Sequence, residues 1–208
     1  MKRICGVILA GGNSSRMGAE KAFSALSGRP MIAHVIERLA PQVYQLVLSA
    51  NGAPARFAAF GLPVLADPIA EPGAERQGPL AGLLAALRYA KAEGFAAVVT
   101  APADAPFLHA RLVSRLCAAS GSGHVVCLAR SAGGLEPLFG LWRTAALAGA
   151  ETAFVQDERA IHRLAARLGY DEAAFTGEAD TIGFSNINSP SDLAKARRRL
   201  SEDPLIGC

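Results

Sequence analysis

Short apolar segments alternate along this chain with segments of helical periodicity. The clearest apolar segment is residues 4–9, which is continuously apolar, as a strand buried on both faces would be. Strands that alternate with helices favour a mostly parallel sheet covered by helices. The predicted fold class is therefore α/β.

Apolar spacing and turn residues place the other elements. Helices are predicted over residues 30–39, 79–90 and 112–119, and strands over residues 45–50, 63–66, 96–100, 124–129 and 138–142. The chain becomes more helical after residue 142. Ser189 is predicted to cap a C-terminal helix, with Pro190 at its first position and Asp192 in its first turn.

Length and composition limit the classes of protein that fit. The chain has 208 residues, 51% of them hydrophobic and 19% charged, which suits one compact domain and excludes disorder and coiled coil. No apolar run approaches the ~18 residues of a membrane span, and the apolar start is too short for a signal peptide, so we expect a cytoplasmic protein without membrane contact. The net charge of +3 neither demands nor excludes nucleic acid. We expect no nucleic-acid partner, because the basic cluster at residues 195–199 lacks interleaved aromatic residues and is typical of a solvated helix end.

Neither the cysteines nor the histidines follow a metal-binding pattern. The four cysteines lie far apart without a CxxC spacing, which is typical of reduced structural thiols. The four histidines are equally scattered, so neither a zinc site nor a disulfide framework is expected.

The strongest functional signal is a glycine-rich loop at residues 9–18, directly after the first strand. Glycines and small polar residues there let consecutive backbone N–H groups face a phosphate chain, and Arg16 and Lys21 add positive charge. The loop matches neither the G-x-G-x-x-G fingerprint nor the Walker A sequence. A glycine-rich turn with exposed basic residues is the alternative interpretation.

An aspartate near the end of a later strand is expected at the same edge of the sheet. Asp104 follows the strand at residues 96–100, between Pro102 and Pro106, whose fixed backbone would hold its carboxylate rigidly. Next to a phosphate loop, this carboxylate predicts a bound Mg²⁺. Taken alone, an aspartate at a strand end is more often a helix cap or a turn residue.

Three further segments should reach this edge. Asn51 and Asp67 end the second and third strands and offer donors and acceptors for a purine edge or a ribose. Gly78, Pro79 and Leu80 lead into a helix through a turn that lets backbone approach a flat base. Ordinary turn chemistry explains each segment equally well when it is taken singly.

Five motifs, in this order, resemble one known family. They are Leu-Ala-Gly-Gly-x-Ser-x-Arg-Met-Gly-x-x-Lys at residues 9–21, Gly-Pro-Leu-Ala-Gly at 78–82, Asp-x-Pro at 104–106, Glu-Pro-Leu-Phe-Gly-Leu-Trp at 136–142 and Asn-Ile-Asn-Ser-Pro-Ser-Asp-Leu at 186–193. Together they resemble the molybdenum cofactor guanylyltransferases of the MobA family over nearly the whole chain. The first motif alone would indicate only the wider family of sugar and isoprenoid nucleotidyltransferases.

The resemblance implies a single three-layer, Rossmann-like nucleotidyltransferase domain over residues 1–208. It would comprise a nucleotide-binding half at residues 1–110, a pterin-substrate half at 111–200 and a flexible tail at 201–208. The implied enzyme transfers GMP from GTP to the terminal phosphate of molybdopterin, normally with molybdenum inserted, and releases pyrophosphate. Mg²⁺ would be its cofactor, and transient contacts with cofactor-synthesis proteins or acceptor apoenzymes are expected.

The site residues that the resemblance implies fall into three groups. Arg16, Lys21 and Asp104 would be catalytic, and Asp104 would also bind the metal. The pterin substrate would contact Arg159, Asn186 and Asn188. The nucleotide-binding residues would be Leu9, Ala10, Gly11, Gly12, Lys21, Asn51, Asp67, Gly78, Pro79, Leu80 and Asp104.

One residue departs from the pattern. Glu136 stands where many relatives have a histidine before the proline. A carboxylate there would not favour a polyanion, so we expect Glu136 to face solvent or to order a loop.

Two other classes of function stay open. A molybdopterin cytidylyltransferase or a sugar-phosphate nucleotidyltransferase would share this fold, because the choice of base depends on a few backbone contacts near Asn51 and residues 78–82. A non-catalytic nucleotide-binding protein that delivers cofactor is less favoured, since it would have no need for Arg16, Lys21 and Asp104 together.

Overall fold

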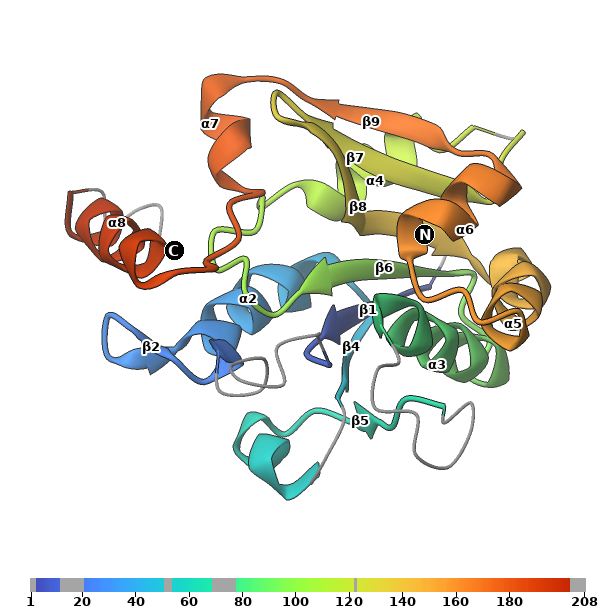
Figure 1. The fold of residues 1–208 in the computed structure, drawn as a ribbon, viewed down its shortest axis with the longest axis horizontal. Coiled ribbons are helices and arrows are strands. Elements are labelled where there is room, and N and C mark those ends of the chain that lie inside the picture. The colour runs from blue at the N-terminus through green and yellow to red at the C-terminus, as the bar shows by residue number, and fades with distance from the viewer. Residues whose placement is uncertain (1–2, 12–20, 51–53, 69–77, 122, 203–208) are drawn as a thin grey trace.

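A seven-stranded β-sheet forms the centre of the computed structural model, which describes residues 3–11, 21–50, 54–68, 78–121 and 123–202 (Figure 1). Its strands lie in the order β5-β4-β1-β6-β8-β7-β9. They are β1 Ile4–Leu9, β4 Gln45–Ser49, β5 Val64–Leu65, β6 Ala97–Pro102, β7 Val126–Ser131, β8 Gly134–Arg143 and β9 Asp171–Phe175. β8 runs antiparallel to both neighbours while the other pairs are parallel, so the predicted mostly parallel sheet is confirmed.

Helices cover both faces of the sheet, which confirms the three-layer α/β fold. They are α2 Met31–Leu39, α3 Gly78–Ala92, α4 Leu112–Ala119, α5 Leu147–Val155, α6 Ile161–Leu168, α7 Glu178–Ile182 and α8 Pro190–Glu202. Short 3₁₀ helices lie at Ala40–Gln42, Pro54–Phe60 and Thr144–Ala146, and β2 Ala25–Leu26 pairs with β3 Arg29–Pro30 in a separate hairpin. α2 and α4 pack on one face of the sheet, and α3, α5 and α6 pack on the other.

The continuous apolar run of β1 is buried on both faces, as its sequence predicts. Ile8 belongs to the hydrophobic cluster on the α2 and α4 side, whereas Val7 belongs to the cluster on the α3 side. Both side chains are fully buried. A third, smaller cluster joins Ala196 of α8 to Leu26 of the hairpin and so fixes the C-terminal helix to the first part of the chain.

β2 and β3 are not among the predicted strands, and β7 lies two residues later than predicted, but β9 and β8 differ most from the sequence prediction. β9 is absent from it, because the sequence Asp-Glu-Ala-Ala-Phe at residues 171–175 carries little apolar bulk, and β9 lies at the edge of the sheet, where it pairs with β7. β8 begins four residues before the predicted start at 138, at Gly134. Its register with β7 shifts between Leu128, which lies opposite Gly140, and Ala129, which lies opposite Glu136. The residues in between form a bulge that periodicity alone does not reveal.

The carboxyl ends of three strands are joined by backbone hydrogen bonds. The amide of Ala10, directly after β1, donates to the carbonyl of Ser49 at the end of β4, with N···O 2.8 Å. The amide of Ala103, directly after β6, donates to the carbonyl of Leu9 at 3.2 Å. The predicted phosphate loop and the predicted metal ligand therefore begin at one edge of the sheet.

α3 approaches this edge closely at a glycine. A Cβ atom built on Gly82 would lie 2.5 Å from Ser49 Oγ and 2.9 Å from Leu9 Cδ2. Both neighbours are held in the sheet, so a larger side chain would push the helix away from the strand ends.

Within the described residues, no helix combines the length and the apolar character that crossing a membrane requires.

Replacing Gly82 by alanine should destabilise the protein. The added methyl group meets Ser49 and Leu9 at distances that require the helix or the strands to shift, which costs about 1–3 kcal/mol in a packed core. Urea denaturation of Gly82→Ala measures the loss. Gly123→Ala is the matched control, because a Cβ there meets nothing within 4 Å, and its effect should stay within about 0.5 kcal/mol. Equal stability of the two variants would contradict the close approach of α3.

Candidate functional site

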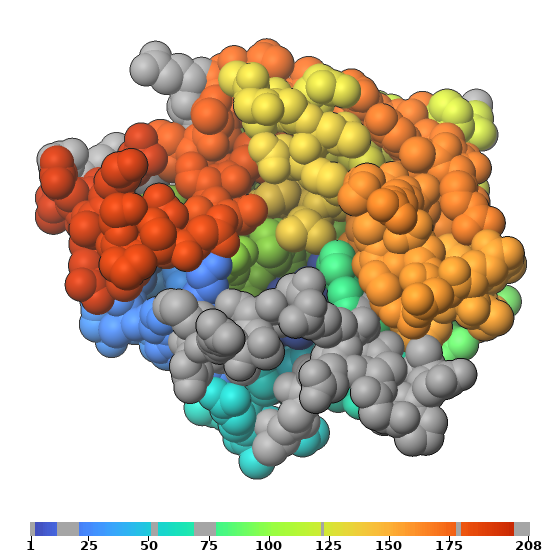
Figure 2. Space-filling view, in the orientation of Figure 1, coloured from blue at the N-terminus to red at the C-terminus, as the bar shows by residue number. Residues whose placement is uncertain are grey.

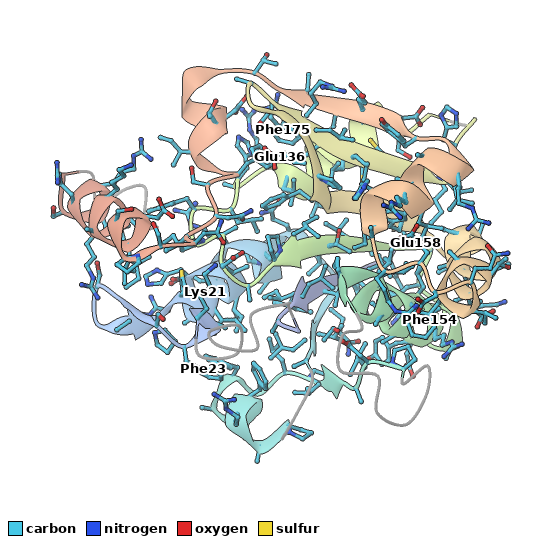
Figure 3. The ribbon with its side chains drawn as sticks, viewed as in Figure 1. Lys21, Phe23, Glu136, Phe154, Glu158 and Phe175 are labelled. Carbon is cyan, nitrogen blue, oxygen red and sulfur yellow. The ribbon has the colours of Figure 1, made fainter. Side chains whose placement is uncertain are left out.

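Lys21 lies at the centre of the candidate site. Its Nζ atom donates to Asp104 Oδ2 at 3.2 Å and to Asn188 Oδ1 at 2.5 Å. The side chains of Lys21 and Asp104 are only 15% and 24% exposed, so this ion pair is partly shielded from water. Figure 3 labels Lys21 beside the strand ends. The ammonium group of Lys21 thus joins the Asp104 turn to the late asparagine segment.

The late asparagine segment is fixed to the Asp104 turn through the backbone. The amide of Ile187 donates to the carbonyl of Asp104 at 2.9 Å, and the Ile187 side chain is buried. Asn186 Oδ1 is buried, and no described residue donates a hydrogen bond to it. A buried carbonyl oxygen without a donor is costly, which fits an acceptor that a ligand or an ordered water satisfies.

The predicted cap of α8 supports this segment. Asp192 Oδ2 accepts hydrogen bonds from the amides of Asn188 at 3.1 Å and Ser189 at 2.9 Å, and the amide of Asp192 donates to Ser189 Oγ at 3.2 Å. These reciprocal bonds confirm the start of α8 that the sequence predicts. They also fix the backbone of Asn188, whose side chain contacts Lys21.

Asp67 is buried next to the end of β4. Ser49 Oγ donates to Asp67 Oδ1 at 2.5 Å, and the whole residue is 6% exposed. Sequence reasoning selects Asp67 and misses Ser49, because a serine at a strand end carries no distinctive signal. Asn51, which follows β4, lies outside the described residues, as do Gly12 and Arg16.

The amino end of α3 forms a second wall of the site. Gly78 adopts φ +63°, and a Cβ atom there would lie 2.6 Å from the carbonyl oxygen of Arg159. The amide of Leu80 donates to the same carbonyl at 3.3 Å. Glycine is required at residue 78 both by its left-handed backbone and by this contact. A cavity of about 600 Å³ opens beside these residues, and Pro137 and Leu138 of β8 also line it.

Arg159 is held tightly within its own loop. Its Nη1 atom donates to the carbonyl oxygens of Phe154 and Glu158 at 3.0 Å each, and its Nη2 atom pairs with Asp157 Oδ1. Its guanidinium carbon lies 4.7 Å from the centre of the Phe154 ring. Asn186 and Asn188 lie at the Asp104 turn instead. The three predicted pterin residues therefore occupy two places, one beside Lys21 and one beside α3.

A cluster that sequence reasoning misses supports the chain before Asn186. Asp180 of α7 accepts hydrogen bonds from His109 Nε2 through Oδ1 and from Arg115 Nη1 through Oδ2, at 2.9 Å each. The His109 Nδ1 atom accepts from the Arg111 amide at 3.0 Å. Burial lowers the pKa of His109 more than its hydrogen bond to Asp180 raises it. Burial is the largest single influence on the pKa of Asp180 and would raise it, but the hydrogen bonds from Arg115, the Gly177 amide and His109, together with the charge of Arg115, outweigh burial and lower the pKa.

Glu136 orders a hairpin, one of the two roles expected for it. Ser131 Oγ donates to Glu136 Oε1 at 2.7 Å and accepts from the Gly133 amide at 3.0 Å. Glu136, labelled in Figure 3, therefore fixes the turn between β7 and β8.

The thiols and the metal-binding side chains give no sign of a second centre. Cys5, Cys117 and Cys127 are free, and burial raises the pKa values of Cys5 and Cys127 to about 12. Across the part of the chain that the structure describes, no group of three His, Cys, Asp or Glu residues could hold a metal ion. A metal at this site would need ligands from a substrate, because Mg²⁺ commonly takes one or two carboxylates together with phosphate oxygens and waters.

Comparisons with known proteins show which family the chain resembles. Residues 6–173 match the model of the MobA-like NTP transferase domain. The chain is 45% identical over 203 residues to a molybdenum cofactor guanylyltransferase of Cereibacter sphaeroides, covering 97% of this chain and 99% of that protein. It is 44% identical over 201 residues to a molybdenum cofactor guanylyltransferase of Rhodobacter capsulatus, covering 97% and 98%. The crystal structure of molybdopterin-guanine dinucleotide biosynthesis protein A from Archaeoglobus fulgidus superimposes with a TM-score of 0.74 at 25% identity, covering 96% of this chain and 100% of that one.

Because of His109, the protein should become less stable as the pH is lowered from neutrality. The lowered pKa of this residue means that the unfolded chain binds this proton more readily than the folded protein, so the free energy of unfolding decreases as pH falls below the ordinary histidine value of 6.5. Asp180 contributes only near and below its ordinary value of 3.8, outside this window. When the pH is lowered from about 7.5 to about 5.5, we expect the melting temperature of His109→Gln to decrease less than that of the parent protein.

His162→Gln is the control for this measurement, because His162 is exposed on α6. It should keep the parent dependence of melting temperature on pH. An identical dependence in His109→Gln and the parent protein would contradict the interpretation.

Proposed function

Because the chain belongs to the MobA-like NTP transferase family, and within it to the molybdenum cofactor guanylyltransferases, we propose that Lys21 and Asp104 form the centre of its GTP site. The protein is a nucleotidyltransferase. Its reaction transfers GMP from GTP to the terminal phosphate of molybdopterin and releases pyrophosphate. The observation that carries the proposed site is the Lys21 ammonium group, which contacts both Asp104 and Asn188 at the carboxyl ends of the strands.

The chemistry requires alignment rather than a protein nucleophile. The attacking group is a phosphate of the acceptor, which is already ionised at neutral pH, so the enzyme must bring two polyanions together and offset their charge. Lys21 donates to phosphate oxygens of GTP in the bound state, and Arg16 adds a second positive charge from the loop. Leu9, Ala10, Gly11 and Gly12, at the start of the loop, bind the phosphate chain of GTP.

Asp104 is suited to hold Mg²⁺ together with the triphosphate. Its Oδ2 atom accepts from Lys21, and no described residue donates a hydrogen bond to its Oδ1 atom. The carboxylate is about a quarter exposed, which leaves room for a hydrated cation. When bound, Mg²⁺ offsets the negative charge that grows on the departing pyrophosphate.

The base and sugar of GTP lie toward the second wall. Gly78, Pro79 and Leu80 present backbone to the base, and Asn51 and Asp67 contact the base and ribose region. The close contact of Gly78 with Arg159 keeps this backbone in a fixed position. Guanine rather than cytosine follows from the relatives that the chain resembles over almost its full length.

Molybdopterin occupies the side of the site that the later part of the chain provides. Asn188 lies at the reacting end beside Lys21, and the buried Asn186 Oδ1 atom accepts a hydrogen bond from the acceptor. Arg159 binds the same substrate at the cavity beside α3. The reaction takes place in the cytoplasm, with transient contacts to cofactor-synthesis proteins or acceptor apoenzymes and with no role for nucleic acid.

Lys21→Ala and Asp104→Ala should each lower turnover by at least about 10²-fold. The first removes a positive charge at the reacting phosphates, and the second removes the proposed ligand of Mg²⁺. Pyrophosphate release from GTP with Mg²⁺ and molybdopterin measures the effect. The melting temperature should change by a few degrees at most, since a partly exposed pair contributes about 1 kcal/mol or less. Lys91→Ala, on an exposed part of α3, is the matched control and should retain parent activity. Normal guanylyl transfer in either site variant would refute the proposed site.

Nucleotide preference can be measured without the acceptor. GTP at ~100-fold above its dissociation constant should stabilise the protein by about 2.7 kcal/mol, and CTP at the same concentration should stabilise it far less. Thermal denaturation with each nucleotide, with and without Mg²⁺, tests this expectation. Stabilisation by CTP alone would instead indicate a cytidylyltransferase.

A further inference from the structure

The turn between α5 and α6 carries Arg159 to the cavity beside α3. Two carbonyl oxygens, the Asp157 carboxylate and the Phe154 ring all contact the Arg159 guanidinium. Figure 3 labels Phe154 and Glu158 on this side of the molecule, and Figure 2 shows the orange surface of α5 and α6 separated from red α8 by the yellow β7 and β8 hairpin. Arg159 thus lines the cavity beside α3, whereas Asn188 contacts Lys21.

Glu158 fixes the backbone of this turn. Its Oε1 atom accepts hydrogen bonds from the amides of Arg159 and Ala160, at 2.9 Å each, and its Oε2 atom lies 3.6 Å from Arg163 Nη1. The side chain is 16% exposed. The amide bonds, from Ala160 first, hold the pKa of Glu158 below its ordinary value despite some burial, so the group is ionised at neutral pH.

The same carboxylate lies next to the amino end of α6 and accepts from the amide of its N-cap residue. Ala160 occupies the N-cap position and has no side chain that can accept a hydrogen bond. A negative charge near the amino end of a helix is favourable, and here it comes from Glu158, two residues before the cap. The backbone amide of Glu158 in turn donates to the carbonyl of Ala153 at 3.0 Å, which ties the turn to the end of α5.

The turn needs this support because its conformation is not intrinsically favoured. Asp157 has φ +62°, in the left-handed region that a side chain other than glycine seldom adopts. Outside the turn, the carbonyl of Arg159 receives one long hydrogen bond, the 3.3 Å bond from the Leu80 amide. Without the Glu158 carboxylate, the amides of Arg159 and Ala160 would lose their acceptor and the turn could relax.

We propose that Glu158 is a positioning residue for the acceptor substrate. By accepting hydrogen bonds from the amides of Arg159 and Ala160, it holds the Arg159 guanidinium at the cavity, where that group binds molybdopterin. This inference rests on the proposed role of Arg159. It assigns Glu158 no contact with either substrate, so the residue acts through Arg159 alone.

Glu158→Ala should raise the KM for molybdopterin about tenfold, the effect of losing a charged hydrogen-bond acceptor, while kcat and the KM for GTP stay within about twofold. Glu158→Gln should recover most of the loss, because its carboxamide oxygen can still accept from both amides. Glu158→Asp keeps the charge but is one methylene too short, so it should resemble Glu158→Ala. Steady-state pyrophosphate release with each substrate varied in turn gives these constants.

A double-mutant cycle tests whether the effect passes through Arg159. Arg159→Ala should raise the KM for molybdopterin, and adding Glu158→Ala to it should raise that KM no further. Glu151→Ala, which removes an exposed carboxylate paired with Arg88, is the matched control and should leave all constants unchanged.

The two proposals can fail separately. An unchanged KM in Arg159→Ala would overturn the role of Arg159 in acceptor binding. A raised KM in Arg159→Ala together with an unchanged KM in Glu158→Ala would overturn the role of Glu158 alone. A lower melting temperature of Glu158→Ala without a change in KM would also overturn it, because Glu158 would then only support the fold. If Glu158→Ala does not fold, an unchanged KM in Glu158→Asp has the same meaning.

Discussion

The proposed site depends on the two contacts that the ammonium group of Lys21 makes with Asp104 and Asn188. This group joins a carboxylate that lies 83 residues away in the chain to an amide side chain 167 residues away. Because Lys21 and Asp104 largely neutralise each other, the pair alone cannot hold a triphosphate. Further positive charge is needed, and the proposed complex obtains it from Mg²⁺ and Arg16. The partial burial of the pair makes each of these charges more effective than it would be in open water.

The topology of the sheet explains why the residues of the proposed site meet there. β1, β4 and β6 are parallel neighbours, so their carboxyl ends bring the residues of the proposed GTP site to one edge of the sheet. β8 runs in the opposite direction beside β6, so its amino-terminal part reaches the same edge and Pro137 lines the cavity there. The chain then returns through α7 to place Asn188 beside Lys21. The Lys21–Asn188 contact therefore connects residues from the two predicted halves, 1–110 and 111–200, at the proposed site.

The parts that the sequence predicts well are those determined by local chemistry. The apolar run of β1 and the cap at Ser189 can each be predicted from a few neighbouring residues, and the structure confirms both. Features that depend on distant partners escape such reasoning. β9 has too little apolar bulk to be recognised as a strand before its pairing with β7 is known. The structural role of Asp180 depends on hydrogen bonds from His109 and Arg115, which are distant in the sequence. Glu158 looks like an ordinary exposed acid in sequence, because its partners are backbone amides.

The separation of Arg159 from Asn186 and Asn188 changes how the acceptor side is understood. The sequence analysis predicts one group of pterin-binding residues, whereas the fold places the asparagines beside the Asp104 turn and the arginine in the turn before α6. In the proposed complex, an acceptor that contacts both must extend from one place to the other, with its phosphate at Lys21 and its pterin toward Arg159. Selectivity then depends on the length and direction of the acceptor as well as on its charge, because both ends must be satisfied together. In that complex, holding the groups at each end in fixed positions is as important as the contacts themselves, which gives the backbone contacts of Glu158 and Asp192 the same role for different residues.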